Sequence, residues 1–168
     1  MKSSTRWIVF ALAFLMIFAL PTTAFANKKI YKARLSTGAE LHEVVGSNAS
    51  GSMALGTNPN GTMHFMLSVR NLSGSVTGAH IHAPADVDEN AGIAITLCGN
   101  GPTPAVFPTC NTVDGSLVLS GDFNGSFLMG SGMSAAEFFN ALDNGLAYVN
   151  VHTALNPAGE ARGQLIGQ

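Results

Sequence analysis

Two histidines placed one residue apart are the clearest chemical feature of this sequence. His80 and His82 lie in the stretch "GAHIHAPADVDENAG", residues 78–92, and the whole chain of 168 residues contains only five histidines. Side chains two positions apart on a β-strand share a face, so both imidazoles would point the same way. Three interpretations are open: metal ligands, catalytic bases, or the polar side of a half-buried sheet.

The metal interpretation needs a third ligand, and the sequence offers one on a later strand. Zinc and copper sites are commonly built from three imidazole nitrogens. His152 is the natural third ligand, and His64 is a further candidate if its strand neighbours that of His80 and His82. We therefore expect copper or zinc as the cofactor if there is one. The alternative is that these histidines only form hydrogen bonds on a sheet surface.

A second group of polar residues lies near the C-terminal end of the chain. Asn150 and His152 share one predicted strand, and Glu160, Arg162 and Gln164 lie on its predicted hairpin partner. Same-face neighbours across a hairpin can pair directly. We expect these residues to form a polar binding face, in which an ion pair between Glu160 and Arg162 steadies His152. The alternative is a surface network that contributes little to stability.

Signatures of enzymes are sparse. The chain has no Gly-x-Ser-x-Gly elbow and no glycine loop that joins a strand to a helix around a phosphate. No nucleophile accompanies Glu160 and His152, so the sequence favours a protein without catalytic residues. The acidic loop at residues 86–90 offers oxygen ligands for calcium but lacks EF-hand spacing, which favours a solvated loop.

The elements that must position these side chains follow from period-2 alternation of apolar and polar residues. The predicted strands are residues 30–36, 51–57, 62–70, 76–82, 93–98, 116–120, 146–153 and 161–166. One short helix is expected near residues 134–144, because Ser134 and Glu137 form a capping box. Roughly eight short strands with turn signals between them predict an all-β antiparallel sandwich or barrel.

Alternation also predicts which way the histidines face. In every strand that carries one, the histidines alternate with the Val, Ile, Leu or Phe side chains that must form the core. We therefore expect His64, His80, His82 and His152 on the polar, outward faces of an antiparallel sheet.

The first 26 residues have the layout of a secretory signal peptide. Lys2 and Arg6 precede an apolar run, Trp7 to Leu20, and Ala24-Phe25-Ala26 supplies small residues for cleavage after Ala26. The run is shorter than the roughly 20 residues that span a bilayer, although a retained anchor is the alternative. We expect one secreted or periplasmic domain, residues 27–168, with no stable membrane span after cleavage.

The net charge of the chain argues against nucleic acid as a partner. Without Lys2 and Arg6 the chain has six Lys and Arg against ten Asp and Glu, a net charge of −4 with neutral histidines. Nucleic-acid binding requires clustered Lys and Arg, which a mildly acidic domain without a basic cluster does not provide. The expected partner is an extracellular or periplasmic protein or a small ligand.

Cys98 and Cys110 are the only cysteines. In an exported chain, an even pair close in sequence predicts one disulfide. It would close a proline-rich segment and contribute about 2–3 kcal/mol in the chain-entropy model. The alternative is a thiolate metal pair, which the long spacing and the lack of a nearby histidine disfavour.

The chain resembles the chordin-type (CHRD) domain family over most of its length, about Tyr31 to Ile166. The motifs that carry the resemblance are "GAHIHAPA" and "LAYVNVHTALNPAGEARGQL". The resemblance extends to "LSTGAELHEVVGSNASGS", "MHFMLSVRNLSGSVTGAHIH" and "GIAITL". It departs from the family pattern in its Cys98–Cys110 pair and in His64, where the family commonly shows an aromatic residue.

This resemblance implies an all-β antiparallel β-sandwich, loosely similar to copper–zinc superoxide dismutase, which also uses a His-x-His strand. The likeness is at the level of the fold and does not transfer function. In animal chordin, tandem copies occur in an extracellular antagonist of bone morphogenetic proteins. The cysteine-rich modules of chordin are missing here, so that role is not transferred. The resemblance implies a non-enzymatic binding or interaction module.

Overall fold

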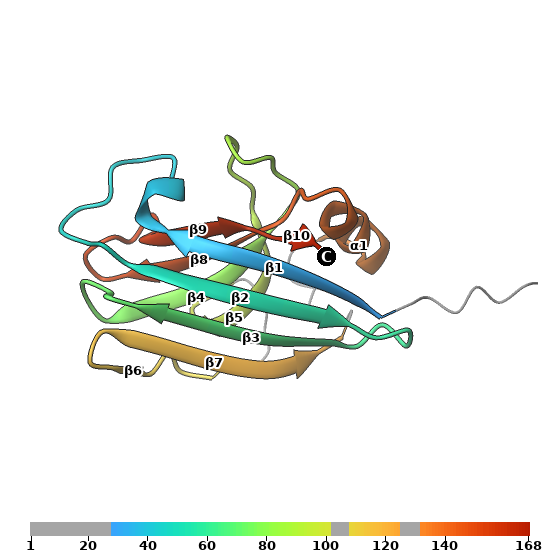
Figure 1. Ribbon diagram of the computed structural model, residues 1–168, viewed down its shortest axis with the longest axis horizontal. Coiled ribbons are helices and arrows are strands. Elements are labelled where there is room, and N and C mark those ends of the chain that lie inside the picture. Colours follow the sequence, from blue (N-terminus) through green and yellow to red (C-terminus); the bar gives the residue numbers. More distant parts are fainter. Residues whose placement is uncertain (1–27, 102–107, 125–131) are drawn as a thin grey trace, which may run out of the picture.

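The computed structural model describes residues 28–101, 108–124 and 132–168 (Figure 1). The predicted signal peptide, residues 1–26, lies outside these ranges. Within them, no helix is both long enough and apolar enough to cross a membrane.

The described residues form mainly β-strands, as the alternation predicts. The elements are β1 (Lys29–Ser36), η1 (Thr37–Ala39), β2 (Ser50–Thr57), β3 (Met63–Arg70), β4 (Val76–His82), β5 (Ile93–Gly99), β6 (Thr112–Val113), β7 (Ser116–Phe123), α1 (Ala135–Asp143), β8 (Tyr148–Thr153), β9 (Ala161–Gln164) and β10 (Ile166–Gly167). Each predicted strand is present, with ends that differ by up to three residues. The last one is divided at Leu165 into β9 and β10, and the two-residue β6 was not predicted.

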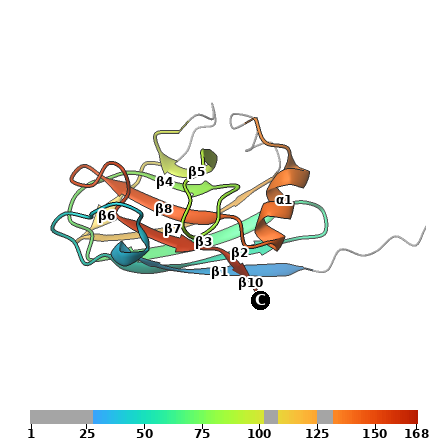
Figure 2. The same ribbon diagram turned by 90° about the horizontal axis from the view of Figure 1, so that it is seen from above.

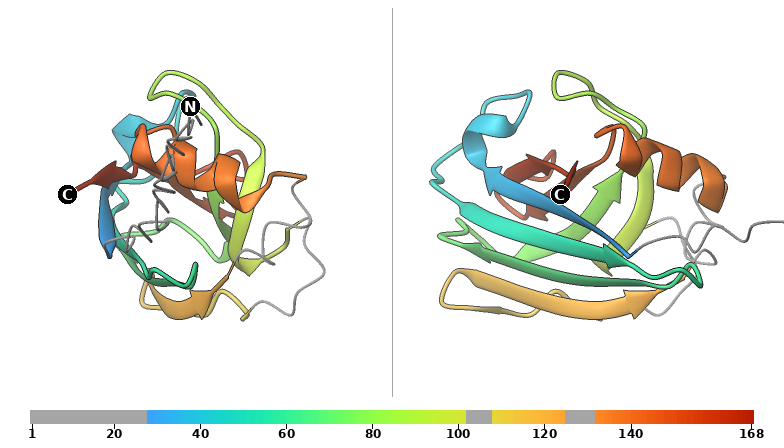
Figure 3. Two further views of the ribbon diagram at one scale, coloured as in Figure 1. Left: turned by 90° about the vertical axis from the view of Figure 1, so that its right-hand side faces the viewer. Right: turned by 45° about the vertical axis from the view of Figure 1, so that its right-hand side comes forward.

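All strands belong to one antiparallel sheet, in the order β5-β4-β8-β9-β1-β2-β3-β7-β6, with β10 paired to β1. The sheet curls on itself, so that β1, β2, β3 and β7 form one layer in front of β4, β5 and β8 (Figures 1 and 3). Ser36 of β1 pairs with Arg162 of β9 where the two layers join. The predicted all-β, sandwich-like fold is confirmed.

The core lies between the two layers and is closed at one end by α1 (Figure 2). On β3, Met63, Phe65, Leu67 and Val69 are buried and the residues between them are exposed. This is the pattern of a strand with one face on the core and one in water. The capping box of α1 is formed by Ser134 as predicted, and Phe138 is fully buried in the core.

The strands β4 and β8 do not follow this pattern, because they are buried on both faces. His80 and His82 are only 5% and 7% exposed, so the prediction that they face outward into water was wrong. Their face is covered by residues 83–92, which connect β4 to β5, and by Asn100 after β5. Alternation within one strand does not reveal such a cover, since it arises from other segments of the chain.

Cys98 of β5 and Cys110 form the predicted disulfide, and both cysteines are buried. Disulfides persist in oxidising compartments, which agrees with an extracellular or periplasmic location.

Candidate metal centre

Pairing of β4 with β8 brings three histidines together. His80 lies opposite Asn150, and Gly78 lies opposite His152, so all these residues share one face of the sheet. The ring centroid of His80 is 5.8 Å from that of His82 and 5.0 Å from that of His152. One potential ligand atom from each histidine lies within 4.8 Å of the others. The structure thus brings together the three residues that the sequence singled out.

Hydrogen bonds show which nitrogen of each ring carries a proton. Every one of the three imidazoles uses one nitrogen to contact a backbone carbonyl oxygen. The contacts are His80 Nε2 to Asn100 O at 2.7 Å, His82 Nδ1 to Ala91 O at 3.0 Å, and His152 Nδ1 to Pro157 O at 3.1 Å. A carbonyl oxygen only accepts, so these ring nitrogens carry the proton and donate it. In a neutral imidazole the remaining nitrogen then has a free lone pair.

The three remaining nitrogens are His80 Nδ1, His82 Nε2 and His152 Nε2. Each is buried and has no hydrogen-bond partner in the described part of the chain. Leaving a buried polar atom without a partner costs about 1–3 kcal/mol. Three such atoms close together in space are the kind of donor set from which metal sites are built, with second-layer carbonyl groups that orient the imidazoles.

Burial keeps these imidazoles neutral. It lowers the pKa of His80 and of His82 to about 4, and the hydrogen bonds to the backbone carbonyls only partly oppose this. Burial also lowers the pKa of His152. Neutral imidazole is the form that binds a metal ion, so the site needs no deprotonation at neutral pH.

Tyr148 and Arg162 support the ring of His82. The Tyr148 ring stacks on it with centroids 4.7 Å apart and planes within 3° of parallel. The guanidinium of Arg162 lies 3.6 Å from the centre of the Tyr148 ring, a cation–π contact. Arg162 is only 2% exposed and therefore forms part of the interior.

Arg162 and Gln164 also hold residues 83–92 against the sheet. Arg162 donates to Glu89 O at 2.7 Å, to Asn90 Oδ1 at 2.9 Å and to Asp86 O at 3.2 Å. Gln164 donates to Ala85 O at 2.9 Å and to Gly145 O at 2.7 Å. Both side chains thus bind groups within the protein, whereas the sequence predicted that they belong to a polar binding face.

Glu160 does not join the histidines. Its carboxylate accepts hydrogen bonds from Ser47 Oγ at 2.6 Å, from Ser73 N and Oγ at 2.7 Å each, and from Thr153 Oγ1. Burial alone would raise the pKa of Glu160, but these hydrogen bonds outweigh it and lower the pKa. The predicted ion pair with Arg162 is not formed, because the two side chains have separate partners.

His64 is likewise far from the centre in the sheet order. Its strand β3 pairs with β2 and β7, whereas β4 pairs with β5 and β8. His64 is exposed, and its Nδ1 lies 3.0 Å from Asp122 Oδ1. His64 was a candidate fourth ligand only if its strand neighboured that of His80 and His82, and the sheet order does not meet this condition.

Two residues near the centre were not singled out from the sequence. The side chain of Glu40 is 3% exposed, and its Oε2 lies 3.5 Å from Asn150 Nδ2. His42 contacts Gly159 O through Nε2 at 3.0 Å. Burial raises the pKa of Glu40, against the opposing effects of His42, Arg162 and Asn150. Both lie between η1 and β2, where the sequence shows no strand or helix pattern that would have placed them.

Comparison with known families identifies the chain. The model of the CHRD domain matches residues 31–165, which is most of the sequence and contains all three histidines of the centre. Comparison with curated proteins and with solved structures gave no significant match. On the extent of the family match, the chain belongs to the CHRD domain family.

Proposed function

We propose that this CHRD domain is a metal-binding module that holds a copper or zinc ion through His80, His82 and His152. The family suggests a binding or interaction module, and the metal is the ligand that the geometry supports best. The observation that carries the proposal is the set of three buried, unpartnered ring nitrogens on one sheet face.

The chemistry of the donors narrows the choice of ion. Three neutral imidazoles suit copper and zinc, whereas magnesium and calcium prefer carboxylate and carbonyl oxygens. Sites of this kind generally bind Cu²⁺ more tightly than Zn²⁺. We therefore expect one ion per chain and a higher affinity for Cu²⁺ than for Zn²⁺.

Calorimetric titration of the chelator-treated protein with Cu²⁺ and with Zn²⁺ tests the proposal. The variant His80→Ala/His82→Ala removes two ligands and should weaken Cu²⁺ binding by at least about 100-fold. The control is His64→Ala, which removes an exposed imidazole outside the centre and should leave affinity unchanged.

A spectroscopic measurement identifies the ligands directly. Electron paramagnetic resonance of the Cu²⁺-loaded protein should show coupling to three imidazole nitrogens in the wild type and in His64→Ala. Wild-type binding weaker than millimolar, or identical isotherms for the two variants, would rule the site out.

A further inference from the structure

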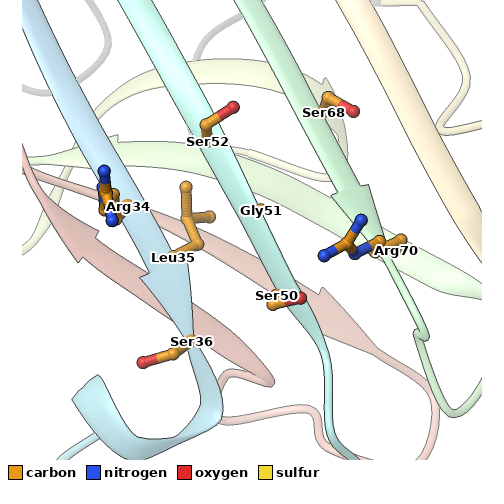
Figure 4. A pocket seen from close by; sticks show the side chains of 8 residues that line it. All are labelled: Arg34, Leu35, Ser36, Ser50, Gly51, Ser52, Ser68 and Arg70. Atoms are coloured by element: carbon orange, nitrogen blue, oxygen red, sulfur yellow. The ribbon is translucent and has the colours of Figure 1, made fainter.

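A second candidate site lies on the other layer of the sheet, and it does not depend on the metal proposal. The outer face of β1, β2 and β3 carries a hollow of about 550 Å³ (Figure 4). Arg34 of β1 and Arg70 of β3 border it on opposite sides of β2. Between them the floor is made of small residues, with Ser50 and Ser52 exposing hydroxyl groups.

The positive charges of the described residues are concentrated on this layer, so the sheet forms a basic cluster that was not apparent from the sequence. Five exposed Lys and Arg residues lie in the described part of the chain: Lys28, Lys29, Lys32, Arg34 and Arg70. All belong to β1, to the residue before it, or to β3. The third arginine of the described residues, Arg162, is buried. The protein is acidic as a whole, yet none of the residues that line the hollow is a carboxylate.

The two guanidinium groups are available for a ligand. Lys29 pairs with Asp143, but neither Arg34 nor Arg70 forms an ion pair or a side-chain hydrogen bond within the described residues. The hydroxyls of Ser50 and Ser52 form no side-chain hydrogen bonds there either. Guanidinium groups bind carboxylate, sulfate or phosphate through two parallel hydrogen bonds.

The spacing favours an extended ligand over a single small ion. Neighbouring strands lie about 4.8 Å apart, so the backbones of β1 and β3 are separated by roughly 10 Å. Pairing of Arg34 with Ser52 and of Ser50 with Arg70 places the two arginines diagonally across β2. An extended polymer with repeated negative groups can contact both guanidinium groups, while its hydroxyl groups contact those of Ser50 and Ser52.

From these observations we infer that the hollow binds an acidic polysaccharide through Arg34 and Arg70. A membrane surface fits less well. The only large apolar residue that lines the hollow is Leu35, which is buried in the core and unable to enter lipid.

Fluorescence anisotropy of a labelled heparin-derived octasaccharide, titrated with the purified protein, tests this inference. The uncharged maltooctaose is the ligand control. The variant Arg34→Gln/Arg70→Gln removes both guanidinium groups and should weaken octasaccharide binding by at least about tenfold. The matched variant Lys28→Gln/Lys29→Gln removes the same charge from β1 and the residue before it, outside the hollow, and should weaken binding by less than about threefold.

Three results would overturn the inference. Equal losses in the two double variants would mean that only overall charge matters. A wild-type protein that does not bind the octasaccharide would exclude the site. Binding to vesicles of phosphatidylglycerol and phosphatidylcholine, without binding to the octasaccharide, would assign the surface to a membrane instead.

Discussion

At the scale of single residues, the protonation of the buried histidines couples stability to pH. The pKa of His80 and of His82 is about 4 in the folded protein and near 6.5 in an unfolded chain. Between these values the unfolded state binds more protons than the folded state. Stability therefore falls as pH decreases from 6.5 to 4, and these groups have no effect above that range.

We predict that the metal-free protein loses unfolding free energy between pH 6.5 and pH 4. Each histidine contributes about 1.4 kcal/mol per pH unit over which only the unfolded state is protonated. Urea denaturation with chelator at several pH values measures this. The loss should be smaller in His80→Gln/His82→Gln and unchanged in His64→Gln. A wild-type profile that is flat between pH 6.5 and pH 4 would contradict the prediction.

Among the described residues, Glu160 is the buried carboxylate that accepts the most hydrogen bonds. Glu160→Gln keeps the shape of the side chain but replaces one carboxylate oxygen by an amide NH₂. That NH₂ faces donors at Ser47 and Ser73 if it replaces Oε1, or at Ser73 and Thr153 if it replaces Oε2. We predict a loss of about 2–3 kcal/mol of unfolding free energy, because buried donors lose their acceptor. Urea denaturation checks this, with the exposed Glu43→Gln as the control. Equal midpoints for the two variants would argue against it.

At the scale of elements, the three histidines are positioned by residues 83–92 as well as by β4 and β8. This connection supplies Ala91 O, which orients His82, and Arg162 holds it through three hydrogen bonds. The backbone N–H of Ala91 also donates to the Tyr148 hydroxyl at 3.3 Å. Loss of Arg162 should therefore affect a histidine that it does not touch.

Arg162→Met should loosen residues 83–92 and weaken Cu²⁺ binding about tenfold, as is typical when a second-layer contact is lost. Hydrogen–deuterium exchange should rise in this connection, and calorimetry gives the change in affinity. The control is Arg34→Met on β1, which removes an exposed arginine from the other layer. Unchanged exchange and affinity in Arg162→Met would show that residues 83–92 keep their conformation without Arg162.

The same elements show how far the sequence alone could lead. Alternation predicted the strands and the shared face of His80 and His82, because a period of two is a local property. That His152 joins them depends on the pairing of β4 with β8, which alternation does not give. Alternation also could not reveal that residues 83–92 and Asn100 cover that face, since such contacts join distant segments. Glu160 was misplaced for a local reason. Its backbone N–H still donates to Val151 O across the hairpin. However, it precedes β9 and follows Gly159, whose φ is 140°, and its side chain contacts Ser73 and Thr153.

At the scale of the whole molecule, the curled sheet separates two candidate sites. The histidines lie on β4 and β8 in one layer, and Arg34 and Arg70 lie on the outer face of the other layer. The core fills the space between the layers, so neither site shares a side chain with the other. Each can therefore be removed by mutation without loss of the other.

The disulfide lies close in sequence to a residue that contacts one of the three histidines. Cys98 precedes by two residues Asn100, whose carbonyl accepts the hydrogen bond from His80. We predict that Cys98→Ala/Cys110→Ala lowers the unfolding free energy by about 2–3 kcal/mol, since the bond closes a short loop. It should also weaken Cu²⁺ binding, because Asn100 would be held less firmly against His80. Denaturation and calorimetry on the same samples separate the two effects. Reduced stability with unchanged affinity would show that pairing of β4 with β5 alone positions Asn100.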